Sequence, residues 1–363
     1  MQNFQNFKFQ HIPDFLKSIS PLHFKFLGAI ATFALIRKYF NGPKNYEFRS
    51  LDKQIAIITG ASAGLGKETA RDLLKSGAIV IFACRNEEKT LAVIKSITDE
   101  KTIKNAIYMN LDLTLFSSVE KFVKEFSKKF DKVDLLINNA GQFTDSLQFT
   151  KDGNEMTMQT NHCSHFLLTG LLLKFLKNSE DPRVINVSSM AHERVNDSLS
   201  REFNKQNYSG IMVYGITKAA NIIFSENLKE FCGKKTDGTN NIKTASLHPG
   251  VVRTEFARFF DRGFLFKICI AVMTPFSLMF SKDEKMGAQT QIHLCHVAKD
   301  AFKNGEYYSD CAVKKKNEII RKYDLEKNIN KYTCEAILRS DCYNNIKDEP
   351  EFMEYFDFFK TKY

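Results

Sequence analysis

The chain has 363 residues, of which 43% are hydrophobic and 26% are charged, and this composition argues against a disordered chain. It carries 52 basic and 42 acidic residues, for a formal net charge of +10. The basic residues are not interleaved with aromatic residues, and the sequence contains no recognisable nucleic-acid-binding module. We therefore expect no nucleic-acid partner. Eight cysteines form neither a CxxC pair nor a zinc-ligand spacing, which predicts reduced thiols facing the cytosol and no metal site.

The first fifty residues are predicted to be a membrane-associated segment, 1–50. The stretch "FKFLGAIATFALIRKYF" (24–40) contains an apolar run of eleven residues, Phe26 to Ile36, closed by Arg37 and Lys38. A bilayer crossing needs roughly 20 apolar residues. Three interpretations therefore stay open: a short or tilted membrane anchor, a helix in the membrane interface, and a helix docked on the protein body. The basic flanks and the phenylalanines favour a bilayer interface.

From Lys53 onward, short apolar runs alternate with helical stretches. The stretch "SSVEKFVKEFSKKF" (117–130) places apolar residues three and four positions apart, which indicates an amphipathic helix. The alternation predicts an α/β fold, a doubly wound parallel sheet of the Rossmann type with about seven strands, over residues 51–312. The apolar runs, each typical of a buried parallel strand, are "QIAIITG", "AIVIFAC", "AIYMNLDL", "VDLLINNAG", "RVINVSS" and "IKTASLHPG".

The segment "TGASAGLG" (59–66) lies where the first strand ends and the next helix begins. Glycines there allow a tight turn, close approach of a pyrophosphate and packing of helix on strand, while the helix N-terminus offers N–H groups to an anion. This position predicts a dinucleotide site. Its predicted contact residues are Gly60, Ser62, Gly64, Leu65 and Gly66.

The end of the second strand predicts which dinucleotide binds. Folds that bind NAD usually place an acidic residue there to hold the ribose 2′-hydroxyl, but "ACRN" offers Arg85 and no acid. A guanidinium suits a 2′-phosphate, so NADP(H) is favoured over NAD(H), the alternative being a surface arginine that faces water. In "LDL" (111–113), Asp112 is predicted to contact the adenine or to cap a helix, with Leu113 beside it.

Beyond Arg253 the regular alternation of strands and helices loosens. "FLFKICIAVMTPFSLMF" (264–280) is strongly apolar and is interpreted as buried core, a lipid contact or the wall of an apolar pocket. His293, Cys295 and His296 do not share one helix face, so a packed helix is preferred over a metal site. Residues 313–363 are predicted to form a tail of peripheral helices.

Five of these phrases occur in the order found in the short-chain dehydrogenase/reductases: "TGASAGLG", "NNAG" (138–141), "VSS" (187–189), "YGITK" (214–218) and "HPGVVRT" (248–254). The chain resembles that family over roughly residues 53–311. "NHCSHFLLT" and "NGEYYSDC" resemble phrases of its retinol-dehydrogenase-like branch. The resemblance implies an NADP-dependent, membrane-attached enzyme that acts on retinoids, steroids or other lipid carbonyls and alcohols.

The spacing in "YGITK" suits a proton-transfer group. A free tyrosine, with a pKa near ~10, is mostly in the wrong form for a base at neutral pH. Positions i and i+4 share a helix face, so the Lys218 ammonium can lie beside the Tyr214 phenol and favour the phenolate. Tyr214 is therefore the predicted general acid and base, and Lys218 is predicted to bind the nicotinamide ribose as well.

The resemblance assigns further site residues. Ser189 is the family's catalytic serine, which holds the substrate oxygen, and Ser188 is its rival. Asn161 matches the asparagine that fixes a water beside the lysine. Asn138 and Asn139 are predicted to tie the backbone together first and to contact cofactor second. The remaining predicted cofactor contacts are Asn139, Ala140, Gly141, Pro249, Gly250 and Thr254.

The sequence therefore predicts hydride transfer between NADP(H) and a lipophilic carbonyl or alcohol of the retinoid, steroid or fatty aldehyde type. The loop at 192–209 is placed near the substrate mouth. Localisation is expected at a membrane, with the catalytic domain facing the cytosol, at the endoplasmic reticulum; a homo-oligomer is compatible with the sequence. The alternatives are a soluble broad-specificity carbonyl reductase and an inactive dinucleotide-binding scaffold or redox sensor.

Overall fold

The computed structural model of the chain describes residues 21–195, 203–206, 208–234, 239–252, 281–316, 318–321 and 324–363. Two predicted elements of the site lie outside the described residues: Thr254 and the apolar segment 264–280. Part of the loop predicted at 192–209 also lies outside them.

One sheet of eight strands, in the order β3-β2-β1-β4-β5-β6-β7-β8, forms the centre of the domain. The first seven strands are parallel and β8 is antiparallel to β7, which confirms the predicted doubly wound fold. All six quoted apolar runs form strands. The strands are β1 (Ile55–Thr59), β2 (Ile79–Cys84), β3 (Ala106–Asn110), β4 (Leu135–Asn138), β5 (Arg183–Val187), β6 (Lys243–His248), β7 (Glu306–Ser309) and β8 (Ala312–Val313).

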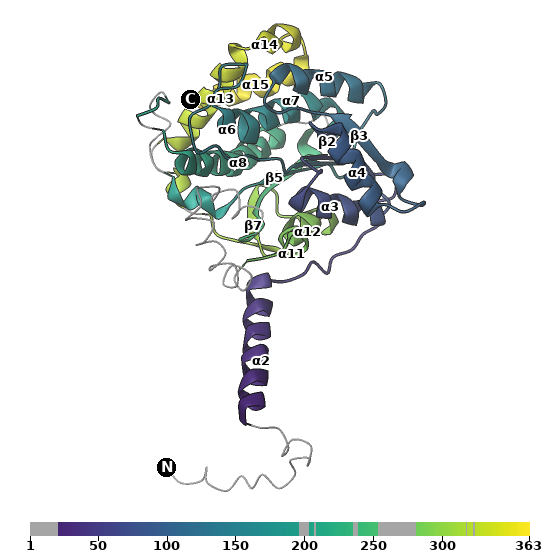
Figure 1. Cartoon of the computed structure of the whole chain (residues 1–363). Coiled ribbons are helices and arrows are strands. Elements are labelled where there is room, and N and C mark those ends of the chain that lie inside the picture. The colour runs from purple at the N-terminus through teal and green to yellow at the C-terminus, as the bar shows by residue number, and fades with distance from the viewer. Residues whose placement is uncertain are drawn as a thin grey trace.

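Helices cover both faces of the sheet (Figure 1). Successive strand residues point to opposite faces, so each strand serves two hydrophobic clusters. Ile57 and Leu136 join the cluster under α5 (Phe116–Ser127) and α7 (Ser164–Leu176). Ile58 and Ile137 join the cluster under the helices of the opposite face, which are α3 (Gly64–Lys75), α4 (Glu87–Ile97) and α12 (Gln289–His296).

The helix predicted at 117–130 is α5, which ends at Ser127, so that Phe130 follows the helix and stacks on Phe126 at 5.1 Å between ring centroids. Three further helices frame the site described below. They are the short α6 (Met156–Met158), α8 (Gly210–Gly233) and the short α11 (Glu284–Gly287).

The C-terminal tail forms three helices outside the sheet layers, α13 (Leu325–Leu338), α14 (Asp341–Ile346) and α15 (Pro350–Lys360). They lie at the edge of the domain beside α5 and α7 (Figure 1). Tyr355 and Phe356 of α15 are fully buried in the same cluster as α7. A Cβ on Gly170 would lie 2.7 Å from the Tyr355 ring, so this glycine allows α15 to approach α7 closely. The tail thus completes the core.

The N-terminal segment contains helix α2 (Pro21–Asn41), which projects away from the domain (Figure 1). Leu35 is 68% exposed and Tyr39 is 81% exposed, which argues against a helix docked on the protein body. Among the residues that the structure describes, no helix has both the length and the hydropathy required to cross a membrane. The linker that follows is held to α12, because Arg49 Nε donates to the Cys295 carbonyl at 3.0 Å.

Candidate active site

The predicted site residues meet at the carboxyl ends of the central strands. The strand order reverses between β1 and β4, since β1 connects to β2 on one side and pairs with β4 on the other. In doubly wound sheets this reversal opens a crevice at the carboxyl edge in which ligands bind. The ends of β1, β4, β5 and β6 carry Gly60, Asn139, Ser188 and Pro249, so the topology brings four separate sequence motifs to one edge.

The glycine turn has the backbone that a pyrophosphate cradle needs. Gly60 and Gly64 have φ values of 69° and 56°, which disfavour any residue with a side chain. A Cβ on Gly66 would lie 2.6 Å from Asn139 Nδ2, so β4 packs directly on this turn. Helix α3 begins at Gly64 after Ala63, which has no polar side chain to cap it. The turn therefore leaves the positive end of a helix dipole open to an anion.

The other two predicted residues of this turn have structural partners. Leu65 packs against Val252 and Ile292 and so joins α3 to the segments that follow β6. Ser62 is half-buried and contacts the thiol of Cys84, whose pKa is raised by burial. Their predicted contact with a cofactor stays a prediction.

Arg85 follows β2 directly and its side chain is exposed. Its carbonyl accepts a hydrogen bond from Asn110 Nδ2 at 3.2 Å, which fixes the backbone at this point. No hydrogen bond or ion pair joins the guanidinium to another residue within the described ranges. A guanidinium held at the strand end and without an internal partner is suited to an external phosphate.

Asp112 closes a local turn. Its carboxylate accepts hydrogen bonds from the Thr114 amide at 2.9 Å and from the Thr114 hydroxyl at 2.7 Å. Helix α5 begins directly after Leu115, which offers no side-chain cap, so the alternative in which Asp112 caps a helix is wrong, and its contact with the adenine stays a prediction. The neighbouring Leu113 carbonyl accepts from Ser164 Oγ at 2.7 Å, which ties the turn to the start of α7.

The "NNAG" turn is held by a threonine that the sequence reasoning missed. Thr59 Oγ1 accepts hydrogen bonds from the backbone amides of Asn139 (3.0 Å) and Ala140 (2.9 Å). Asn139 Nδ2 donates to the Thr59 carbonyl at 2.8 Å, and Asn138 Nδ2 donates to Asn186 Oδ1 at 2.8 Å. Both asparagines therefore tie neighbouring strands together, as expected. Thr59 opens the quoted phrase "TGASAGLG", so its position at the strand end was the available signal.

Tyr214 and Lys218 lie on one face of α8, four residues apart. Their exposed fractions are 6% and 2%, so solvent around them is restricted. The Lys218 ammonium lies 5.4 Å from the centroid of the Tyr214 ring and donates to the Val187 carbonyl of β5 at 3.1 Å. A Cβ on Gly141 would lie 3.4 Å from Lys218 Nζ. The helix thus holds the cation between the tyrosine, the end of β5 and the "NNAG" turn.

Asn161 lies in a π-helical turn, Gln159–Cys163, and is completely buried. Its side chain bonds the backbone of Gln142, accepting from the amide at 2.7 Å and donating to the carbonyl at 2.9 Å. It also donates to Thr217 Oγ1 at 3.2 Å. The amide of Asn161 therefore fixes the chain directly after Gly141. Sequence reasoning missed Gln142, which directly follows "NNAG", and Thr217, which lies inside "YGITK".

The structure separates the two rival serines. Ser188 is fully buried and donates its hydroxyl to the Lys218 carbonyl at 2.7 Å. Ser189 is 7% exposed and accepts a hydrogen bond from the Ala191 amide at 3.3 Å, at the start of the 3₁₀ turn Met190–Arg194. Because its donor hydrogen is not used in that bond, Ser189 is the serine able to donate to a substrate oxygen.

Two buried histidines support the site. His165 Nε2 lies 2.9 Å from Thr59 Oγ1 and its Nδ1 lies 3.1 Å from the Asn161 carbonyl, so the ring joins β1 to the π-helical turn. Burial lowers the pKa of His165 to about 3 and that of His162 to about 4. Both rings are therefore neutral at physiological pH. The sequence reasoning quoted "NHCSHFLLT" but did not single them out.

The turn after β6 is also shaped by a glycine. Gly250 has a φ of 90°, and a Cβ there would lie 2.6 Å from Lys282 Cε. Lys282 is buried and pairs with Asp310 at 2.6 Å. The ion pair joins the chain that follows the segment containing Thr254 to the turn between β7 and β8. The two ends of that segment are held together by the Lys282 amide, which donates to the Val251 carbonyl at 2.8 Å.

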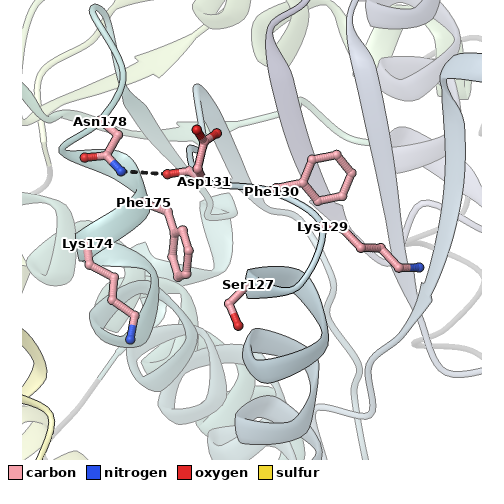
Figure 2. A pocket seen from close by; sticks show the side chains of 7 residues that line it. All are labelled: Ser127, Lys129, Phe130, Asp131, Lys174, Phe175 and Asn178. Carbon is pink, nitrogen blue, oxygen red and sulfur yellow. Dashed lines mark hydrogen bonds between the residues drawn. The ribbon is translucent and has the colours of Figure 1, made fainter.

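A depression of about 660 Å³ lies far from these residues (Figure 2). It is bordered by Phe130 and Phe175, near the ends of α5 and α7, where the chain turns back into β4 and β5. This is the amino edge of the sheet, opposite to the edge where parallel sheets bind ligands. Asn178 Nδ2 donates to the Asp131 carbonyl there at 2.6 Å. We assign the depression no function.

Among the described residues no group of three or more His, Cys, Asp or Glu side chains is placed to hold a metal.

Comparison with known proteins agrees with this geometry. The short chain dehydrogenase family model matches residues 54–262. The chain is 36% identical to human retinol dehydrogenase 12 over 79% of this chain and 87% of that protein, and 32% identical to mouse retinol dehydrogenase 14 over 79% and 88%. In fold the chain is similar to an L-sorbose reductase from Gluconobacter frateurii, with a TM-score of 0.57 and 20% sequence identity. The match covers 74% of this chain and 99% of the reductase.

Proposed function

The chain belongs to the short-chain dehydrogenase family, and from this premise we propose that it is an NADP(H)-dependent oxidoreductase of lipophilic carbonyls and alcohols. The single observation that carries the proposal is the grouping of Ser189, Tyr214 and Lys218 at the carboxyl edge of the sheet. Lys218 lies 5.4 Å from the Tyr214 ring centroid and is hydrogen-bonded to Val187, the last residue of β5, two positions before Ser189. Retention of all three groups favours an enzyme over an inactive scaffold.

The residues present fit a dinucleotide. The turn at Gly60, Gly64 and Gly66 would hold the pyrophosphate at the N-terminus of α3, because a side chain at any of them would meet strain or backbone atoms. The exposed guanidinium of Arg85 would bind a ribose 2′-phosphate, which supports NADP(H) over NAD(H). When bound, the nicotinamide would supply or accept the hydride.

The chain's own residues would move the proton. Tyr214 donates its phenolic proton to the substrate oxygen during carbonyl reduction and takes it back during alcohol oxidation. The neighbouring Lys218 ammonium favours the phenolate and so assists release of that proton. Ser189 donates a hydrogen bond to the same oxygen and stabilises charge that develops on it.

A lipophilic substrate is supported by two observations. The relatives matched over most of their length are named retinol dehydrogenases. In this chain Phe143 meets the Tyr214 ring edge to face at 6.2 Å, so the neighbourhood of the reacting phenol is apolar on that side. Such a surface favours a hydrocarbon substituent on the reacting carbon.

The proposal is tested by a substrate panel. Purified protein in mild detergent is assayed for NADPH and NADH oxidation with all-trans-retinal, a ketosteroid and decanal. We expect turnover of at least one of them, faster with NADPH than with NADH at equal concentration. If the protein binds NADPH but turns over none, the inactive-scaffold alternative replaces this proposal.

We also propose that α2 attaches the protein to a membrane surface, with the catalytic domain in the cytosol. The support is the exposed apolar surface of α2, where Ile30 is 50% and Leu35 is 68% exposed. We expect the full chain to sediment with membranes after a high-salt wash and after alkaline carbonate. A variant that begins at residue 42 should stay in the supernatant. Release of the full chain by carbonate would contradict attachment through α2.

A further inference from the structure

The loop that precedes the catalytic helix is tied to the C-terminal tail through one buried residue, Glu155, by its carboxylate on the loop side and its backbone amide on the tail side. Glu155 caps the short helix α6 and is 1% exposed. One carboxylate oxygen accepts from the Met158 amide at 2.6 Å, and the other accepts from the Tyr208 hydroxyl at 2.9 Å. The Glu155 amide donates to the Tyr332 hydroxyl oxygen of α13 at 3.1 Å. We call Glu155, Tyr208 and Tyr332 the Glu155 junction.

The junction reaches the chain beside Tyr214 through Thr144. Thr144 Oγ1 lies 2.8 Å from the Tyr208 hydroxyl, so the two side chains hold each other. A Cβ on Gly210 would overlap the Thr144 carbonyl, so the start of α8 lies directly against the same residue. The preceding residue, Phe143, is the one whose ring meets the Tyr214 ring. A displacement at Tyr208 is therefore passed on to the wall next to the reacting phenol.

Aromatic packing reinforces these hydrogen bonds. The Phe203 ring lies 6.3 Å from the Tyr208 ring and 6.1 Å from the Tyr332 ring, so it fills the space between loop and tail. All three rings pack against the cluster that contains Val213 and Ile216 of α8 and Ile329 of α13. The tail thus supports the catalytic helix and the loop in one cluster, although residues 325–363 lie beyond the segment that the family model matches.

We propose that the Glu155 junction makes α13 a determinant of substrate specificity: it sets the width of the substrate entrance by holding Tyr208, Thr144 and Phe143 in place. The inference rests on the proposed function. Tyr208 and Tyr332 are positioning residues, because they act through Glu155 and Thr144. A substrate that extends past Tyr214 along Phe143 depends on this wall, whereas a small one is bound at the reacting group alone.

Decanal and propanal carry the same reacting group but differ in length, so they distinguish a substrate that contacts the wall at Phe143 from one that does not. We expect Tyr332→Phe and Tyr208→Phe each to raise KM for decanal by about three- to tenfold, the equivalent of one net hydrogen bond. KM for propanal and KM for NADPH should change by less than about twofold, which is less than the loss of one net hydrogen bond would cause. Since both tyrosines act through Glu155, the double variant should be scarcely worse than the worse single variant.

Tyr343→Phe is the matched control, because Tyr343 belongs to the tail and packs on Phe356 of α15, away from the junction. It should leave both KM values unchanged. Equal effects on decanal and propanal, no effect on either, or the same effect from Tyr343→Phe would each overturn the proposal.

A second measurement does not depend on activity. Arg194 and Lys205 are exposed trypsin sites in the loop. The proposal expects faster tryptic cleavage there in Tyr332→Phe than in the unchanged protein or in Tyr343→Phe. Equal cleavage rates in Tyr332→Phe and in the unchanged protein would contradict the proposed role of the Glu155 junction, even if the enzyme is active. Conversely, faster cleavage together with no turnover of any aldehyde would support the junction and contradict the proposed function.

Discussion

Tyr214→Phe is expected to lower kcat/KM for carbonyl reduction by about 10³-fold, within the range that general acid catalysis contributes. The phenyl ring occupies the same space against Phe143, so fold and cofactor binding should persist. What is lost is the proton donor to the substrate oxygen. The measurement is the initial rate of NADPH oxidation with the best substrate of the panel, together with NADPH binding followed by fluorescence.

Tyr355→Phe is the control for this variant. It removes a buried phenol that bonds the Phe166 carbonyl at 3.1 Å on the far side of α7. The loss of this hydrogen bond should reduce stability by about 1 kcal/mol without changing the rate. If Tyr214→Phe retained turnover within about tenfold of the unchanged enzyme, far from the effect of a lost general acid, another residue would have to supply the proton.

Arg85→Ala is expected to raise KM for NADPH by about 10- to 100-fold, the usual contribution of a charge-assisted hydrogen bond to a phosphate. KM for NADH should stay nearly constant, because NADH has no 2′-phosphate for the guanidinium to bind. The measurement is KM for each cofactor with one aldehyde at saturation, and the decisive quantity is the ratio of the two changes.

Lys95→Ala is the matched control, since Lys95 is an exposed cation in the last turn of α4. It lies about 12 Å along the helix from Glu87, the first residue of α4, and carries the same charge as Arg85. The control should leave both KM values unchanged. An equal loss for NADPH and NADH in Arg85→Ala would remove the assignment of the 2′-phosphate to this residue.

Much of the fold was predictable from local pattern. Six apolar runs correspond to six of the strands, and the glycine phrase at 59–66 lies at the turn between β1 and α3. Such elements depend on residues close in sequence, whose periodicity reports which face is buried. The family phrases added Ser189, Tyr214 and Lys218, whose catalytic roles remain proposals.

Other features came from contacts between distant residues. The sequence left Ser188 and Ser189 as rivals, and the bond from Ser188 to the Lys218 carbonyl separates them. It assigned no chemistry to the tail, yet Tyr332 reaches the amide of Glu155 across 177 residues. Thr59 and His165 were missed because their partners lie on other elements.

The sequence by itself determined the succession of strands and helices, the glycine turn and the spacing of the tyrosine and lysine, since each depends on neighbours within a few positions. Only the tertiary structure decided that the ends of β1, β4, β5 and β6 meet, and that α13 supports the loop before α8. The physical reason is that hydrogen bonds and packing act over a few ångströms in space. Which residues come that close depends on how the whole chain closes its core.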